Sequence, residues 1–253
     1  MHRRLQALLW DVDGTLAETE RNGHLPAFNA AFTDLGLPWR WDPATYAALL
    51  RITGGRERMA AWLEQTTAAA VDPALLDALV ASKKHHYGER LRGGSIALRP
   101  GVARLLEEAA AIGLPQLIVT TSSRAAVVAL LQGSLAPHAH AFGGWISGDD
   151  VQRKKPDPEG YRMALARLGL AADHILVVED SPQGLAAAVA AGLPTLVTLS
   201  EVSRAEPLEC FEQARAVVNH LGTTADPLEV LQGPACPQGQ VTLSWLEQLL
   251  PPA

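Results

Sequence analysis

The sequence LLWDVDGTL at residues 8–16 joins an apolar run to two aspartates that lie two positions apart. In an extended chain, Asp11 and Asp13 point to one side and Val12 points to the other. Two carboxylates this close repel each other unless a cation lies between them. Gly14 then lets the chain turn away. The motif predicts either a polar turn or a phosphoryl-transfer site, in which one aspartate attacks and the other moves a proton.

Composition narrows the class of protein. The chain has 253 residues, of which 48% are hydrophobic, enough for one large domain or two small ones. With 21 Lys and Arg against 27 Asp and Glu, the net charge of −6 argues against nucleic-acid binding. The apolar stretch before Asp11 is only about six residues long, too short for a signal peptide or a membrane span. We expect a monomer without nucleic-acid or membrane partners, in the cytoplasm, or in a plastid stroma if the source is a plant.

Apolar runs of strand length alternate with helix-period segments along most of the chain. The runs occur at residues 5–10, 116–121, 175–179 and 194–199, with a weaker one at 214–221. The helical patterns occur at residues 100–112, 124–131, 158–168 and 182–191. This alternation predicts an α/β fold with an open, parallel, Rossmann-like sheet, formed by residues 1–16 and 95–253. Ligands of such sheets bind outside the carboxyl ends of the strands, where Asp11 and Asp13 lie.

The alternation stops between residues 17 and 94, where four helical patterns follow one another, at residues 24–35, 42–52, 56–65 and 73–91. Asp42-Pro43 and Asp72-Pro73 are favourable helix starts, because an N-cap aspartate precedes a proline at the first helical position. An insert of this length is too long for a loop and is expected to pack as its own domain. We call residues 17–94 the cap segment and expect it to lie over the site as a lid.

Two later clusters could bind a phosphate group. The hydroxyl side chains of Thr121, Ser122 and Ser123 lie between a strand run and a helix, where they could bind an anion. Ser123 could equally serve only as the N-cap of that helix. Lys155 follows two basic residues that fit a solvated loop, and it could hold a phosphate oxygen or offset the charge of the nucleophile.

A second pair of acids, Glu179 and Asp180, ends the run at residues 175–179. Adjacent side chains at a strand end point in opposite directions. Mg²⁺ needs hard oxygen ligands, so one of these carboxylates with Asp11 and a backbone carbonyl would suffice. We expect Asp180 to be the direct ligand and Glu179 to be either an alternate ligand or a carboxylate that only orients its neighbours.

Four motifs resemble those of the haloacid dehalogenase-like phosphohydrolases in order and position: DVDGT, the Thr121/Ser123 strand end, Lys155-Pro156 and Glu179-Asp180. The helical insert after the first motif is similar to members of this family with an α-helical cap. The resemblance implies that Asp11 is the nucleophile that forms an aspartyl-phosphate and that Asp13 is the general acid and base. It implies that Thr121 and Lys155 bind phosphate. It further implies a Mg²⁺ cofactor held by Asp11, Asp180 and the carbonyl of Asp13.

Three strings of the cap segment resemble the CbbY group of this family, AETERNGH at 17–24, WDPATY at 41–46 and ITGGRERM at 52–59, as does IALRPGV at 96–102. The resemblance implies hydrolysis of xylulose 1,5-bisphosphate, an inhibitory by-product of Rubisco, to xylulose 5-phosphate. A bisphosphate needs a second anion site away from the metal. Gly54 and Gly55, followed by Arg56 and Arg58, could supply it through backbone N–H groups, a helix N-terminus and guanidinium charge. The arginines could otherwise begin an exposed helix, and we expect Arg56 to contribute more than Arg58.

Three further cap residues are candidates for contacts with the sugar. The resemblance makes Glu20 a candidate partner of a sugar hydroxyl, with His24 and Tyr46 as other polar contacts, although Glu20 could be a surface charge and Tyr46 a core residue. Residues 19–24 form a segment one residue longer than in the resembled mutases, which puts the position of His24 in question. A helix is expected at residues 242–249 of the tail, for which the sequence suggests no function.

Other functions stay open at this point. A β-phosphoglucomutase-like mutase would use the same core but return the phosphoryl group to the sugar. A phosphoglycolate phosphatase would have little use for Arg56 and the double glycine. A noncatalytic sugar-phosphate-binding protein is disfavoured because both Asp11 and Asp13 are present.

Overall fold

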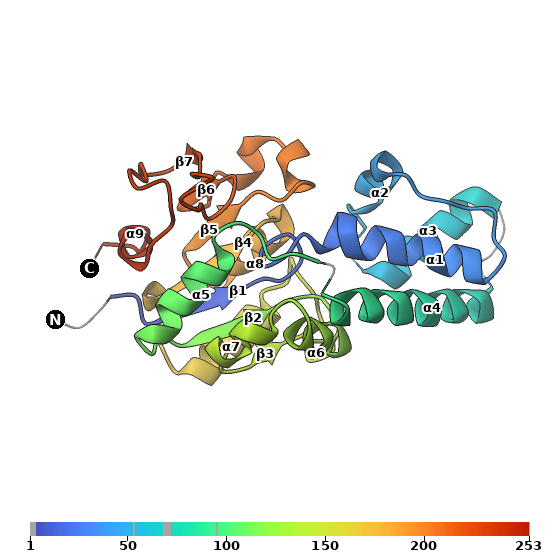
Figure 1. Ribbon diagram of the computed structural model, residues 1–253, viewed down its shortest axis with the longest axis horizontal. Helices are drawn as coiled ribbons and strands as arrows, with labels where there is room; N and C mark the ends of the chain where they lie inside the picture. Colours follow the sequence, from blue (N-terminus) through green and yellow to red (C-terminus); the bar gives the residue numbers. More distant parts are fainter. Residues whose placement is uncertain (1–3, 53, 68–71, 95, 253) are drawn as a thin grey trace.

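The computed structural model describes residues 4–52, 54–67, 72–94 and 96–252 (Figure 1). Residues 1–3, 95 and 253 of the expected core, and residues 53 and 68–71 of the cap segment, lie outside this description. The described strands form one seven-stranded sheet in the order β3-β2-β1-β4-β5-β6-β7. Their bounds are β1 Ala7–Trp10, β2 Gln116–Val119, β3 Trp145–Ile146, β4 Ile175–Glu179, β5 Thr195–Thr198, β6 Ala216–Val218 and β7 Val230–Gln232.

The central strands are parallel and buried on both faces, as the apolar runs predicted. Leu9 of β1 pairs with Leu117 of β2 on one side and with Val177 of β4 on the other. Leu8 and Trp10 pack in one hydrophobic cluster with α5 (Val102–Ala111), α6 (Arg124–Gln132) and α9 (Leu243–Gln248). Leu9 packs in a second cluster, with α7 (Glu159–Leu168) and α8 (Pro182–Ala190). The predicted Rossmann-like α/β fold is therefore confirmed.

The sheet has two strands that the sequence did not predict. β3 is only two residues long, so it carries no periodic pattern. β7 is half-buried and pairs antiparallel with β6, with an irregular register, at the edge of the sheet. The tail helix was predicted, and Thr242 caps it by accepting a hydrogen bond from the backbone N–H of Trp245 at 3.2 Å. Short 3₁₀ helices lie at Ala136–Ala141, Ala172–His174, Ser203–Ala205 and Leu208–Phe211.

The cap segment contains a π-helical turn, Glu20–His24, and four α-helices: α1 Leu25–Asp34, α2 Pro43–Leu49, α3 Gly55–Thr67 and α4 Pro73–Arg92. The side chains of Asp42 and Asp72 cap α2 and α4, as the Asp-Pro pairs predicted. These helices extend to one side of the sheet (Figure 1) and enclose a hydrophobic cluster of their own around Phe28, Phe32 and Trp41. The C-terminal end of α4 packs instead against α6 of the sheet's helices.

Two chain crossings join the cap segment to the sheet. They run side by side, with an antiparallel bridge between Ala17 and Leu98 and a hydrogen bond from the N–H of Arg99 to the carbonyl of Leu16 at 3.0 Å. The loop that carries Asp11 and Asp13 lies directly before the first crossing. Among the described residues, no helix is both long and apolar enough to cross a membrane.

Candidate active site

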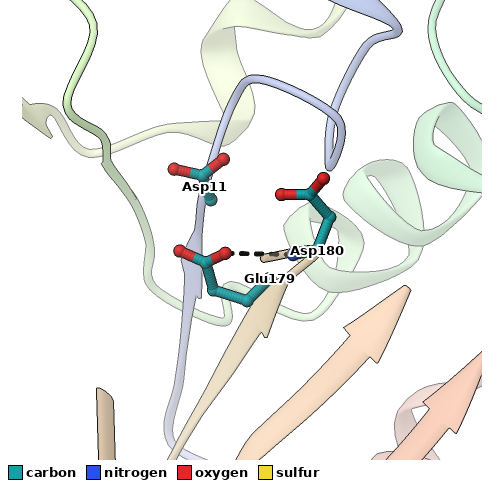
Figure 2. Close-up of side chains that lie close together, drawn as sticks. All are labelled: Asp11, Glu179 and Asp180. Atoms are coloured by element: carbon teal, nitrogen blue, oxygen red, sulfur yellow. Dashed lines mark hydrogen bonds between the residues drawn. The ribbon is translucent and has the colours of Figure 1, made fainter. Parts of the chain in front are cut away.

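Three carboxylates meet at the carboxyl ends of β1 and β4 (Figure 2). Asp11 follows β1, Glu179 is the last residue of β4, and Asp180 comes directly after it. Asp11 and Asp180 are 7% exposed and Glu179 is fully buried. One oxygen from each carboxylate lies within 4.8 Å of the others. The parallel pairing of β1 with β4 therefore brings together acids that are far apart in the sequence.

Lys155 is held between two of these acids. Its Nζ donates to Asp11 Oδ1 and to Glu179 Oε1, both at 2.6 Å, and to the carbonyl of Val119 at 2.8 Å. Although burial works against its charge, the carboxylates of Asp11 and Glu179 raise the pKa of Lys155 well above its usual value. The lysine is thus a fixed positive charge beside the expected nucleophile, as the sequence predicted.

Glu179 orients its neighbours. Its Oε1 accepts hydrogen bonds from Lys155 and, at 3.0 Å, from Tyr161 Oη. Its Oε2 accepts from the backbone N–H groups of Asp180 and Ser181 at 3.0 and 3.3 Å. A Cβ at Gly184 of α8 would lie only 1.9 Å from Oε1, so glycine is needed there for the carboxylate to fit. With both oxygens occupied, Glu179 fits the orienting role better than that of a direct metal ligand.

Asp180 points away from Glu179, toward the turn after β1. A Cβ at Gly14 would lie 2.2 Å from Asp180 Oδ2, so the carboxylate packs directly against that glycine. Burial, with the like charges of Glu179 and Asp11, raises the pKa of Asp180 well above its usual value. Burial also raises the pKa of Asp11, and the charges of Glu179 and Asp13 add to this effect. Lys155 opposes it but does not cancel it. A cation between Asp11 and Asp180 would relieve this repulsion, and their oxygens are the hard ligands that Mg²⁺ prefers.

Asp13 has a different environment from Asp11. Its Oδ1 accepts from Thr19 Oγ1, from Tyr87 Oη at 3.2 Å and from His24 Nε2 at 3.3 Å, and its Oδ2 accepts from Ser122 Oγ. Burial alone would raise its pKa. His24, through its charge when protonated and its hydrogen bond, together with the hydroxyls of Ser122 and Thr19, instead lowers the pKa of Asp13 well below its usual value.

The position of His24 is set by the π-helical turn. The N–H of Leu25 donates to the carbonyl of Glu20, five residues back, so the turn contains one residue more than an α-helical turn. This turn places His24 beside Asp13. The His24 ring stacks on Tyr87 with 3.9 Å between centroids. Lys83 Nζ lies 2.7 Å from His24 Nδ1, and burial lowers the pKa of Lys83 to about 8.

A cavity of about 170 Å³ lies between the strand ends and the cap segment. Its core side includes Asp11, Asp13, Thr121, Lys155 and Asp180, as well as Ser203 and Glu206 of the loop after β5. Its cap side includes Glu20, Ala47, Leu50, Arg51, Gly54 and Arg58. Acidic groups and Lys155 thus occupy one end of the cavity, and arginines contribute to its cap wall.

The structure separates the two arginines of the GGRER string. Arg58 is 7% exposed and lines the cavity, and its guanidinium donates to the carbonyls of Leu49 and Ile52 and to Tyr46 Oη. Arg56 is exposed, pairs with Asp77 at 2.5 Å and does not line the cavity. The expectation that Arg56 contributes more than Arg58 is therefore wrong, because the helix turns Arg56 toward solvent.

Several other predicted substrate contacts lie beside the cavity, outside its lining. Tyr46 is buried and donates to Glu20, which itself lines the cavity. Gly55 packs toward Phe28, since a Cβ at this glycine would lie 3.4 Å from the Phe28 ring. Ser123 caps α6, the simpler of its two predicted roles, while Ser122 and His24 are bound to Asp13. Of Thr121, Ser122 and Ser123, only Thr121 lines the cavity.

Some site residues were not predicted from the sequence. Tyr87 and Thr19 donate to Asp13, and Arg51 lines the cavity next to the cap's other polar groups. Lys83 and Tyr87 lie four residues apart in α4, a spacing that puts them on one helix face. That spacing was visible in the sequence, but nothing local shows that this face meets Asp13.

Comparison with known proteins identifies the family of the chain. Residues 5–192 match the haloacid dehalogenase-like hydrolase family. The chain is 45% identical over 234 residues to the plasmid-encoded CbbY protein of Cupriavidus necator, covering 88% of this chain and 89% of that protein. It is 44% identical over 224 residues to CbbY of Rhodobacter capsulatus, covering 88% of this chain and 98% of that protein.

A solved structure extends the comparison to three dimensions. A CbbY variant from Rhodobacter sphaeroides, in complex with xylulose-(1,5)bisphosphate, superimposes with a TM-score of 0.78 at 36% identity, covering 87% of this chain and 98% of that one. The resemblance inferred from the sequence motifs is thereby confirmed. The chain belongs to the haloacid dehalogenase-like hydrolases and is a phosphatase homologous to the CbbY proteins.

Proposed function

We propose that the protein is a Mg²⁺-dependent phosphatase of small sugar bisphosphates and that it converts xylulose 1,5-bisphosphate, an inhibitor of Rubisco, to xylulose 5-phosphate. One observation carries the proposal: a single cavity has Asp11, Lys155 and Asp180 in its core wall and buried Arg58 in its cap wall. The similar CbbY variant that binds xylulose-(1,5)bisphosphate supports this choice of substrate.

Asp11, Asp180 and the carbonyl of Asp13 would hold Mg²⁺. The fit rests on the chemistry of the donors, because Asp11 and Asp180 are buried acids close enough to share a cation. When bound, Mg²⁺ would act as a Lewis acid on a phosphate oxygen and neutralise developing charge. Glu179 serves this site indirectly, since its oxygens are already bound by Lys155, Tyr161 and backbone N–H groups.

The reaction has two steps in this scheme. In the first, Asp11 attacks phosphorus in line, the Asp11–phosphorus bond forms, the ester bond breaks, and Asp13 gives a proton to the leaving alkoxide. In the second, Asp13 takes a proton from a water that attacks phosphorus, and the Asp11–phosphorus bond breaks. Lys155 offsets the negative charge of Asp11 and of the phosphoryl oxygens throughout.

The cap wall would bind the second phosphate of the substrate. Three hydrogen bonds within the cap segment, to Leu49, Ile52 and Tyr46, fix the guanidinium of Arg58. A guanidinium has five N–H donors, so donors remain for an anion. Arg51 lines the same wall, and Glu20, held by Tyr46, is suited to a sugar hydroxyl. This arrangement favours an ester with phosphates at both ends over a monophosphate.

A pair of substitutions tests this second anion site. Arg58→Ala should raise KM for xylulose 1,5-bisphosphate by roughly 10- to 100-fold, with a much smaller effect on a monophosphate, because one charge-assisted contact is lost. Arg56→Ala is the matched control, since Arg56 pairs with Asp77 on the surface, and it should leave both KM values nearly unchanged. The KM values of both variants are measured from the release of inorganic phosphate. A separate assay for isomerised sugar phosphate distinguishes a phosphatase from a mutase. Equal losses for the two esters in Arg58→Ala would contradict the proposed site.

A further inference from the structure

One buried arginine of the second crossing is not part of the cavity. Arg99 is 4% exposed and lies next to the point where the two crossings pair. Its side chain lies at the carboxyl ends of β5 and β6, beside the turn that follows Asp13. Neither the phosphate chemistry nor the substrate contacts proposed above make use of it.

The guanidinium of Arg99 joins three separate segments. It donates to the carbonyl of Gly14 in the catalytic turn. It donates to the carbonyls of Thr198 and Leu199 at 2.8 and 2.6 Å, at the end of β5, and to the carbonyl of Asn219 at 2.9 Å, after β6. A guanidinium carries five N–H donors on three nitrogens, so it can reach more carbonyls, and carbonyls farther apart, than the three donors on the single nitrogen of an ammonium.

Glu18 supplies the opposing charge. Its Oε1 lies 2.9 Å from Arg99 Nε, and the carboxylate is about one-fifth exposed. Glu18 belongs to the first crossing, so the ion pair links the two crossings in addition to their backbone bridge. The pair therefore ties the entrance and the exit of the cap segment to the strand ends.

The contact with Gly14 connects this arginine to the metal-side carboxylate. Asp180 Oδ2 packs against Gly14, where a Cβ would be only 2.2 Å away. The same glycine also faces Ser200. Ser200 lies two residues after Thr198, whose carbonyl accepts a hydrogen bond from Arg99. Movement of the Gly14 turn would therefore change the space available to Asp180 and its distance from Asp11.

We propose that Arg99, with Glu18 as its counter-ion, is a positioning residue that holds the Gly14 turn against Asp180 and so fixes the spacing of the carboxylates of Asp11 and Asp180. The inference rests on the Mg²⁺ site of the proposed function. Arg99 does not line the cavity, so it would not touch the substrate. Loss of the Arg99 side chain should reduce the affinity for Mg²⁺ even in the absence of a sugar phosphate.

The test is Mg²⁺ binding to the folded, substrate-free protein, measured by calorimetry. Arg99→Lys keeps the positive charge but cannot reach all of the carbonyls, and it should weaken Mg²⁺ binding by about 10-fold, the equivalent of roughly 1.4 kcal/mol. Arg104→Lys is the matched control. Arg104 also donates to a backbone carbonyl, that of Val241 at 2.6 Å, and pairs with a glutamate, but it contacts neither Gly14 nor β5 in the described hydrogen bonds. It should bind Mg²⁺ like the wild type.

A second variant separates geometry from charge and covers the case in which Arg99→Lys does not fold. Arg99→Met/Glu18→Gln removes both charges of the pair, so the net charge near the site is unchanged, and it should also weaken Mg²⁺ binding. Unchanged Mg²⁺ affinity in either folded variant would overturn the positioning role. Absence of Mg²⁺ binding by the wild type would instead contradict the proposed metal site itself.

Discussion

Among the individual residues, the two aspartates of the catalytic loop differ in pKa because the groups around their carboxylates differ. Among the described residues, Asp11 forms a side-chain hydrogen bond with Lys155 alone, and burial, together with the charges of Glu179 and Asp13, raises its pKa. Asp13 has several donors and a lowered pKa. Asp11 is thus suited to attack beside a cation, whereas Asp13 is held in the form that accepts a proton from water.

The donors to Asp13 have a further consequence for pH dependence. The first step needs protonated Asp13, which the same donors disfavour. Tyr87→Phe removes the hydroxyl that donates to Asp13 Oδ1 at 3.2 Å and leaves the ring that stacks on His24. The pKa of Asp13 should then rise toward its usual value, and the pH optimum of kcat/KM should move to higher pH.

The measurement is a pH–rate profile of the two proteins with the same substrate and saturating Mg²⁺. A stability difference alone would change the amount of active protein and not the shape of the profile. A profile of Tyr87→Phe identical in shape to that of the wild type would show that this hydroxyl does not influence the acid–base group.

At the scale of elements, the π-helical turn and α4 act together on Asp13. Gly23 lies in the turn, and a Cβ there would be 2.7 Å from the ring of Tyr87 and from Ile96 Cδ1. The turn and α4 therefore approach more closely than any residue with a side chain allows. The close approach brings His24 and Tyr87, from two different elements, to the same carboxylate.

Gly23→Ala should force the turn and α4 apart. We expect it to destabilise the fold by about 1–3 kcal/mol, as overpacking commonly does, and to lower kcat more than it raises KM, because the donors to Asp13 are displaced. Gly88→Ala is the control on α4. Its nearest neighbour would be the flexible Arg92 side chain at 3.3 Å, so it should leave activity unchanged and stabilise the helix by up to about 1 kcal/mol. Thermal unfolding and steady-state kinetics measure both, and wild-type kinetics in Gly23→Ala would exclude the proposed tight fit.

The elements also show what the sequence could predict. Asp11 and Asp180 were predictable because parallel strands bring their carboxyl ends to one edge, so residues directly after strand runs must meet there. Lys155 follows no predicted strand run, and its place near them was inferred from the resemblance of Lys155-Pro156 to a family motif. Arg56 and Arg58 could not be distinguished in this way. Two positions along a helix are separated by about 200°, so one arginine must face away from the cavity, and the phase of α3 depends on packing within the cap segment.

At the scale of the whole molecule, the cavity depends on the placement of the cap segment over the sheet. The cap contributes Glu20 and Arg58, the strand ends contribute Asp11 and Asp180, and the loop before α7 contributes Lys155. On the surface, Arg21 of the cap segment pairs with Glu201 of the loop after β5 at 2.9 Å. Exposed pairs of this kind contribute only about 0–1 kcal/mol, so the Arg99–Glu18 pair, whose arginine is buried, is the stronger candidate for linking the cap segment to the sheet.

The elements of the overall architecture were predictable where their sequence patterns were long enough to show a period. The five apolar runs and the helical insert were visible because each spans several periods of its pattern. The short β3 and the edge strand β7 were not, since two or three residues carry no period. The contacts around Asp13 depend on how α4 returns to the sheet, which no local stretch of the sequence specifies.

The proposed chemistry requires that Asp11 forms a phosphoryl intermediate with the help of Mg²⁺. The most direct test measures inorganic phosphate released from xylulose 1,5-bisphosphate by the wild type and by Asp11→Asn, each with Mg²⁺ and with a chelator, after circular dichroism has shown that both are folded. We expect one phosphate per substrate from the wild type with Mg²⁺ only, and a loss of at least about 1,000-fold in Asp11→Asn. Turnover by Asp11→Asn close to the wild-type rate would exclude Asp11 as the nucleophile, and phosphate release that persists without the metal would exclude Mg²⁺ as the cofactor.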